Sequence, residues 1–312
     1  MMMKQSFLQK MWRTLPILIA SLALAGTAGA DLKIVTTIPD LADFAGRIGR
    51  DKVSVSSLAR GPEDPHNVMM RPSMISSLRA ADLFVVLGFD LEHAYAPALV
   101  RESRNRAIQP GARGYLDCSL SVTPLEVPTS LSRSEGDIHP RGNPHYNLDP
   151  LRMKRAAEAM ARKMGELDPP NAAFYTQNAA TLGAELEKRT AEWKRRIGTR
   201  RFVAYHPVWA YFAERFGVEP VATIQPKPGI EPGPRYVDAL IARMKGEGIG
   251  LIVKESYFGD RLPQQIARST GARVVTVAVQ VHATRAAPDY FAMIDQIVAA
   301  FDQNGKPGKQ GE

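Results

Sequence analysis

The stretch Asn171–Ile197, NAAFYTQNAATLGAELEKRTAEWKRRI, decides the expected fold of this 312-residue chain. Its apolar side chains recur at intervals of three, four or seven residues, which is the spacing of one buried face of an α-helix. These positions are Tyr175, Ala179, Leu182, Leu186, Trp193 and Ile197. Such a helix extends about 40 Å, and Asp168-Pro169-Pro170 separates it from a helix predicted over Leu151–Leu167. We therefore expect one long, rigid helix between two halves of the chain.

Strand-like and helix-like segments alternate on both sides of the long helix. The β-rich segments before it are 32–37, 53–58, 82–88 and 114–117, and those after it are 201–205, 220–224, 251–255 and 273–279. Such alternation predicts an α/β fold in which each half has a mostly parallel sheet flanked by helices. The predicted domains are an N-terminal lobe, 31–168, a connecting helix, 169–199, and a C-terminal lobe, 200–312.

The first thirty residues have the pattern of a secretory signal peptide. Lys4, Lys10 and Arg13 form a basic start, an apolar run follows from Leu15 to Ala25, and small residues precede Asp31. About eleven apolar residues are too few to span a bilayer of about 30 Å, which disfavours a membrane anchor. We expect cleavage after Ala30 and a periplasmic destination. No cysteine follows the apolar run, so a lipoprotein anchor is not expected.

Composition excludes several other classes. Cys118 is the only cysteine, so this exported chain has no internal disulfide and no Cys-based metal site. The formal net charge is +8, and loss of the three basic residues of the leader, which has no acidic residue, reduces it to +5. Basic residues are spread along the chain without interleaved aromatic residues, which argues against a nucleic-acid partner.

Three of the six histidines stand beside proline at the ends of predicted elements. They are His66 in Asp64-Pro65-His66, His145 in Asn143-Pro144-His145 and His206 in Tyr205-His206-Pro207, separated by 79 and 61 residues. No local metal-binding motif has such spacing, so only a fold that joins distant loops makes them one site. Neutral imidazole is a common ligand of zinc and related metals. The alternatives are an exposed turn residue for His66 and a packed side chain for His206.

These segments resemble the ligand motifs of the metal-specific solute-binding proteins of bacterial ABC importers, which are receptors for zinc and manganese. The similarity extends over Asp31–Asp302 and includes Gly142–Pro150, Tyr211–Gly217 and Gly229–Pro232. The resemblance implies two lobes joined by a rigid helix, with His66 and His145 as ligands from the N-terminal lobe and His206 from the C-terminal lobe.

The fourth ligand is open, because this sequence departs from the family there. Members usually supply an Asp after the last strand, whereas residues 278–283 contain no acid. His282 is one candidate, with a surface imidazole as the alternative, and Glu255 at the end of a predicted strand is the other, with a salt bridge or a loop cap as its alternative. Water is a third possibility. The family's His-rich loop is reduced to His139 within 132–142, which we expect to be at best a weak auxiliary donor.

Ligand chemistry indicates which metal is carried. Three imidazoles suit zinc, whereas manganese prefers more oxygen ligands, so zinc is the expected cargo and manganese the less favoured one. The expected partners are an ABC permease and a periplasmic zinc chaperone, and the protein is expected to be a monomer without enzymatic activity. The alternative function is a secreted zinc-dependent hydrolase, against which stand the lack of a His-Glu-x-x-His motif and of a clear general base.

Overall fold

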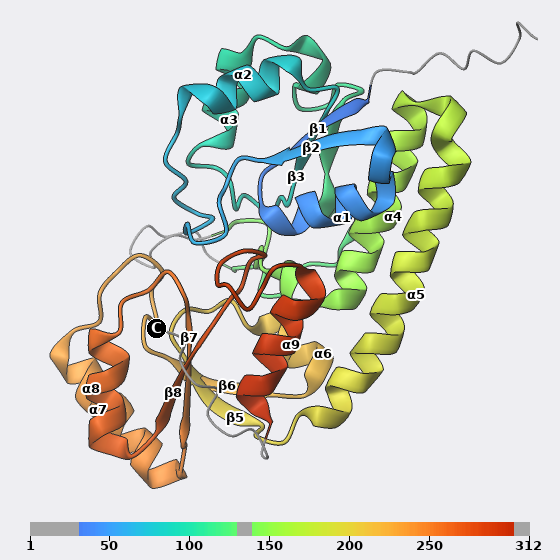
Figure 1. The fold of residues 1–312 in the computed structure, drawn as a ribbon. Coiled ribbons are helices and arrows are strands. Elements are labelled where there is room, and N and C mark those ends of the chain that lie inside the picture. Colours follow the sequence, from blue (N-terminus) through green and yellow to red (C-terminus); the bar gives the residue numbers. More distant parts are fainter. Residues whose placement is uncertain (1–30, 130–138, 303–312) are drawn as a thin grey trace, which may run out of the picture. The chain divides into compact units, whose positions relative to one another are not determined.

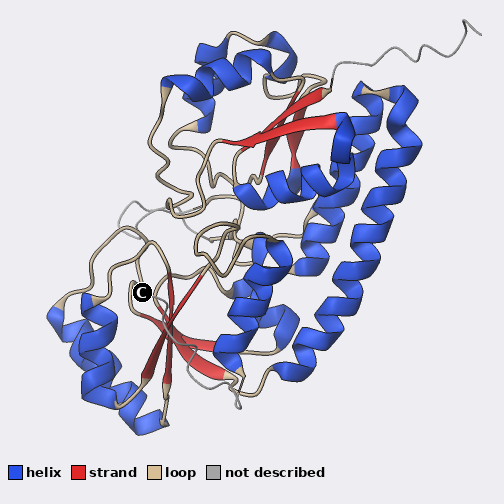
Figure 2. Cartoon of the chain, in the orientation of Figure 1, coloured by secondary structure: helices blue, strands red, loops and turns tan. Residues whose placement is uncertain are grey.

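The protein, seen in a computed structural model, contains two parallel four-stranded sheets (Figures 1 and 2). The structure describes residues 31–129 and 139–302, so the predicted cleavage point after Ala30 lies outside the described residues. The described chain from Leu32 onward belongs to one compact unit. In this part of the chain, no helix is both long enough and apolar enough to cross a membrane.

The first sheet has the strand order β2-β1-β3-β4. Its strands are β1 (Leu32–Thr36), β2 (Val53–Ser57), β3 (Leu83–Val86) and β4 (Tyr115–Asp117). β1 pairs in register with β2 from Leu32↔Val53 to Thr36↔Ser57. All four residues of β3 are buried, as expected for a strand covered on both faces. The helices of this half are α1 (Pro39–Gly49), α2 (Pro72–Ala80), α3 (Ala96–Ser103) and α4 (Pro150–Leu167).

The second sheet repeats this arrangement in the order β6-β5-β7-β8. Its strands are β5 (Arg201–Ala204), β6 (Glu219–Thr223), β7 (Leu251–Glu255) and β8 (Arg273–Val277), all parallel. The helices after β5 are α6 (Ala210–Phe216), α7 (Pro234–Glu247), α8 (Arg261–Thr270) and α9 (Tyr290–Phe301). The predicted α/β class with two parallel sheets is confirmed.

The predicted long helix is α5 (Ala172–Arg196), which lies against α1, α4 and α9 (Figure 1). Its 25 residues correspond to about 37 Å. The apolar positions predicted to share one face are buried, among them Tyr175, Leu186 and Trp193. They contribute to one hydrophobic core that contains residues of both halves, from Leu32 to Phe301. α5 therefore fixes the two sheets through a shared core.

Each sheet also has a smaller core on its other face. In the N-terminal half this second cluster is centred on Phe84 and Leu99, and in the C-terminal half on Val203 and Ile252. Because all strands of a sheet run parallel, the loops after their carboxyl ends lie along a common edge. The loop after β2 and the loop after β5 carry His66 and His206 at these edges.

Candidate metal centre

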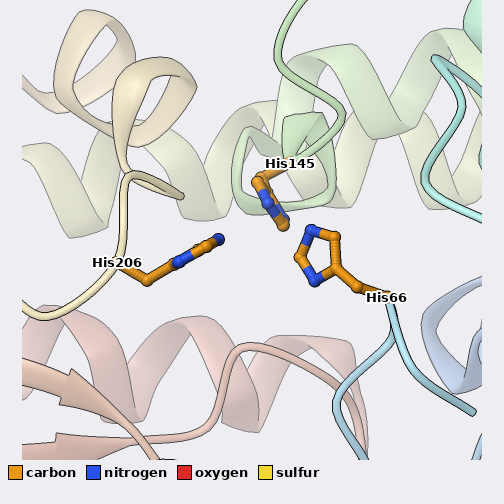
Figure 3. A group of neighbouring side chains, drawn as sticks. All are labelled: His66, His145 and His206. Carbon is orange, nitrogen blue, oxygen red and sulfur yellow. The ribbon is translucent and has the colours of Figure 1, made fainter. Parts of the chain in front are cut away.

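The three predicted histidines meet at one place, as Figure 3 shows. One nitrogen from each of His66, His145 and His206 lies within 4.8 Å of the others. The ring centroids of His66 are 5.0 Å from His145 and 5.4 Å from His206, and those of His145 and His206 are 5.8 Å apart. All three side chains are buried, with 5 or 6% of their surface exposed. Among the described residues, this is the one group of three or more potential metal ligands at such distances.

Asp64 orients the imidazole of His66. Its Oδ1 accepts a hydrogen bond from the His66 backbone N at 3.0 Å and lies 2.8 Å from Nδ1 of the ring. Burial acts to raise the pKa of Asp64, but its hydrogen bonds to His66 outweigh burial and hold that pKa below its usual range. Since an ionised carboxylate only accepts, Nδ1 carries the proton. Nε2 of His66 is buried without a hydrogen-bond partner among the described residues, so its lone pair is available to an ion.

His206 follows β5 and is supported by Gln225, which follows the neighbouring strand β6. The Oε1 atom of Gln225 lies 3.1 Å from Nδ1 of His206. Burial, together with the nearby His66, lowers the pKa of His206 to about 4. The imidazole is therefore neutral at pH 7, as a metal ligand must be.

His145 lies before a short 3-10 turn, Tyr146–Leu148, that leads into α4, in a loop that is bonded to the C-terminal half. Asn143 Oδ1 accepts a hydrogen bond from the His145 backbone N at 2.9 Å, while Asn143 Nδ2 donates to the carbonyl of Pro207 at 2.9 Å. The hydroxyl of Tyr211 in α6 donates to the Asn143 carbonyl at 2.7 Å. Burial and the neighbouring histidines hold the pKa of His145 well below its usual value. The loop thus bridges both halves at the site.

A fourth imidazole, that of His139, lies beside the group. Its ring centroid is 5.3 Å from that of His66 and 6.4 Å from that of His145. A cavity of about 170 Å³ is lined by His139, His145 and His206, together with Glu126. The structure therefore places His139, expected to be a weak auxiliary donor, at the wall of a cavity that reaches two of the three ligand candidates. Most of the loop that contains it, 130–138, lies outside the described residues.

The structure does not bring Glu255 and His282 into the three-histidine group. Glu255 is fully buried at the end of β7, where its Oε1 accepts a hydrogen bond from Trp209 Nε1 at 2.9 Å. Burial raises the pKa of Glu255 to about 8, so its carboxyl group is protonated at neutral pH. His282 is exposed and has a φ of 63°. It lines a different cavity, of about 500 Å³, with Pro39 and Gly61.

The outer partners of the ligands were not predicted from the sequence. Asp64 belongs to the Asp-Pro-His motif, but the motif alone does not show that it orients His66. For Gln225 a signal exists, because it follows a predicted strand whose parallel neighbour ends at His206, and neighbouring strand ends meet in such sheets. The hydroxyl of Tyr211 gave no recognisable signal, because its contact with Asn143 spans 68 residues.

Comparison with known proteins gives the family of the chain. Residues 34–304 match the family model described as the zinc-uptake complex component A, periplasmic. The chain belongs to this family. It is 24% identical over 288 residues to the high-affinity zinc uptake system protein ZnuA of Yersinia pestis, covering 85% of this chain and 89% of the relative. It is also 23% identical, over 78% of both chains, to the manganese ABC transporter substrate-binding lipoprotein PsaA of Streptococcus anginosus.

Solved structures with the same fold include structures of ZnuA. A crystal structure of ZnuA superposes with a TM-score of 0.73 at 28% identity, covering 88% of this chain and all of the other. A zinc-bound ZnuA lacking residues 138–173 of its own numbering gives the same TM-score and identity, and covers 89% of this chain and all of the other. These proteins confirm the resemblance inferred from the histidine motifs.

Proposed function

We propose that this protein binds one divalent transition-metal ion, with zinc preferred, and delivers it to an ABC-type import permease. The observation that carries the proposal is the convergence of three buried, neutral imidazoles from loops that are far apart in sequence. The ion is the cargo of this site. His66, His145 and His206 are its proposed ligands.

The distances between the three histidine nitrogens are close enough to those in a zinc site that the rings need to move only a little to bind the ion. Zinc–nitrogen bonds of about 2.0–2.1 Å in a tetrahedral site place the nitrogens about 3.4 Å from one another. The nitrogens here lie no more than 4.8 Å apart, so modest ring rotations bring them into range. Asp64 and Gln225 already engage Nδ1 of His66 and His206, which leaves Nε2 of both rings for the ion.

The donor set favours zinc over manganese. Three imidazoles without a carboxylate in the group suit zinc, whereas manganese is better served by oxygen donors. The relatives include proteins named for zinc uptake and one named for manganese transport, and the donor set supports grouping this chain with the former. Glu255 and His282 are not part of the proposed site.

The same proposal covers the cellular setting. The protein acts in the periplasm after cleavage of its leader following Ala30, as a monomer, with a membrane permease as its receiver and a zinc chaperone as a source of the ion. Its functional halves are the predicted lobes 31–168 and 200–312, joined by 169–199. A hydrolytic role finds no support, because the carboxyl group of Glu255 is protonated and bonded to Trp209 instead of lying in the histidine group.

Metal titration of the mature chain tests this function. The wild-type protein is expected to bind one zinc ion and to prefer zinc to manganese in competition. His66→Ala and His206→Ala should each weaken zinc binding about 100-fold or more. His282→Ala is the matched control, since it removes an imidazole outside the group and should bind as the wild type does. Equal loss in all three variants, or no zinc binding by the wild type, contradicts the proposal.

A further inference from the structure

The outer partners of His66 and His206 differ in charge. Nδ1 of His66 faces the ionised carboxylate of Asp64 at 2.8 Å, whereas Nδ1 of His206 faces the neutral amide oxygen of Gln225 at 3.1 Å. Hydrogen bonds to an ionised acceptor are shorter and roughly twice as strong as those between neutral groups. The hydrogen bond at Nδ1 is therefore stronger for His66 than for His206.

Gln225 is held firmly in its place. The backbone ladder between β5 and β6 continues past both strands, with Ile224 N donating to the Ala204 carbonyl at 2.8 Å and Gln225 N donating to the Tyr205 carbonyl at 2.9 Å. Its side chain is buried, with 8% of the residue's surface exposed. The amide therefore reaches His206 from a backbone that is fixed on the adjacent strand end.

A second contact limits the motion of His206 itself. Its ring centroid lies 5.6 Å from that of Phe258, which stacks in turn on Tyr205 at 4.3 Å. With the ring packed on this side, the hydrogen bond from Nδ1 to Gln225 selects the tautomer whose lone pair is on Nε2. A neutral acceptor supplies less electron density to an imidazole than a carboxylate does, so His206 is the less basic ligand of the two.

We propose that Gln225 is the positioning residue for His206 and that its neutral amide keeps the bond from His206 to the ion weaker than the bond from His66. This inference rests on the proposed metal-binding function and adds an order of release. His206 is the ligand that leaves the ion first, while Asp64 keeps His66 bound longer. Gln225 therefore sets the zinc affinity below the value that these three histidines can reach, which suits a protein that must hand over its cargo.

Exchange of the outer partners tests the inference by competition titration and by zinc dissociation kinetics. Gln225→Glu is expected to tighten zinc binding about 10-fold, mainly through slower dissociation, and Gln225→Ala to weaken it about 10- to 100-fold. Asp64→Asn, the reverse exchange at His66, should weaken binding about 10-fold. Gln177→Glu makes the same charge change at an exposed position on α5 and should leave affinity unchanged. Affinity of Gln225→Glu within twofold of the wild type, or weaker, overturns the inference.

The tautomer of His206 gives a second readout that does not need a metal. Nitrogen-15 NMR of the metal-free wild-type protein at neutral pH should show His206 with its proton on Nδ1, and Gln225→Ala should lose this preference without loss of the folded spectrum. A proton on Nε2 in the wild type overturns the inference even if no variant folds. Failure of the proposed function is distinguishable, because it appears as a wild-type protein that binds no zinc.

Discussion

At the scale of single residues, the lowered pKa of His206 makes the stability of the folded protein depend on pH. Burial brings this pKa from 6.5 to about 4 in the folded protein, so the unfolded chain binds the proton more tightly. His206 therefore does not affect the free energy of unfolding above pH 6.5. As the pH drops from 6.5 to 4, its protonation in the unfolded chain lowers that free energy by on the order of 3 kcal/mol. Chemical denaturation of the metal-free protein at pH 7 and pH 4.5 should show this loss. His206→Asn should lose less, and an equal loss in both proteins contradicts the assignment.

Glu255 gives a prediction of opposite sign. Burial raises its pKa to about 8, so the folded protein binds a proton that the unfolded chain releases above its usual value of 4.5. Its contribution to stability is fully present below 4.5 and declines as the pH rises to 8. Glu255→Gln, which imitates the protonated form, should raise the free energy of unfolding at pH 9 by on the order of 1–3 kcal/mol. Zinc affinity at pH 7 should stay within about twofold, whereas a large loss identifies Glu255 as a ligand.

At the scale of elements, α6 positions the loop that carries His145. The hydroxyl of Tyr211 donates to the Asn143 carbonyl and accepts from Leu125 N at 3.0 Å, so it joins both ends of the intervening segment. The guanidinium of Arg152 lies 4.6 Å from the centroid of the same ring. α6 therefore holds this loop through Tyr211, and Arg152 of α4 packs on the same ring, so the position of His145 depends on both halves.

Tyr211→Phe isolates the contribution of this hydroxyl, because it keeps the ring over which Arg152 lies. It should lower the free energy of unfolding by about 1–2 kcal/mol through the two lost hydrogen bonds. It should also weaken zinc binding about 10-fold, because the loop that holds His145 loses its tie to α6. Hydrogen exchange over 139–149 and zinc titration measure both effects.

Tyr175→Phe is the matched control for that experiment. The Tyr175 hydroxyl donates to Asp168 Oδ2 at 2.5 Å, at the junction of α4 and α5 and not at the histidine group. This variant should lose comparable stability while its zinc affinity remains that of the wild type. Parallel loss of zinc affinity in both variants shows a general loosening instead of a specific role for Tyr211.

At the scale of the whole molecule, the shared core predicts cooperative unfolding. Leu186 on α5 is fully buried in the cluster that contains residues of both halves. Calorimetry of the metal-free protein should show one unfolding transition. Leu186→Ala should lower the free energy of unfolding by about 2–5 kcal/mol, and unfolding should still occur in one transition. Two separate transitions, with only one moved by the substitution, contradict a shared core.

Much of the fold was predictable because its signals are local. The apolar spacing from Tyr175 to Trp193 and the break at Pro169 placed α5 within one residue at each end. Between β3 and α3, Gly88, Phe89 and Asp90 have positive φ angles and begin a turn, and α3 starts only at Ala96. Phe89 and Asp90 are not glycine, so no local pattern indicates this left-handed backbone.

The site was predictable only in part, because its details depend on long-range contacts. The histidine motifs and the edge rule for parallel strands were enough to predict the meeting of His66, His145 and His206. The same rule placed Glu255 at a strand end, but it does not specify a rotamer, and the carboxyl group turns to Trp209. The proximity of His139 to His66 joins residues 73 apart in sequence, which no local pattern encodes.

The central claim is that one ion binds between three imidazoles, and anomalous diffraction at the zinc absorption edge tests it most directly. Crystals of the zinc-loaded protein should show a single strong peak about 2.0–2.1 Å from a nitrogen of each of His66, His145 and His206. A peak that touches fewer than two of these rings, or zinc bound only at the surface around His282, would contradict the account.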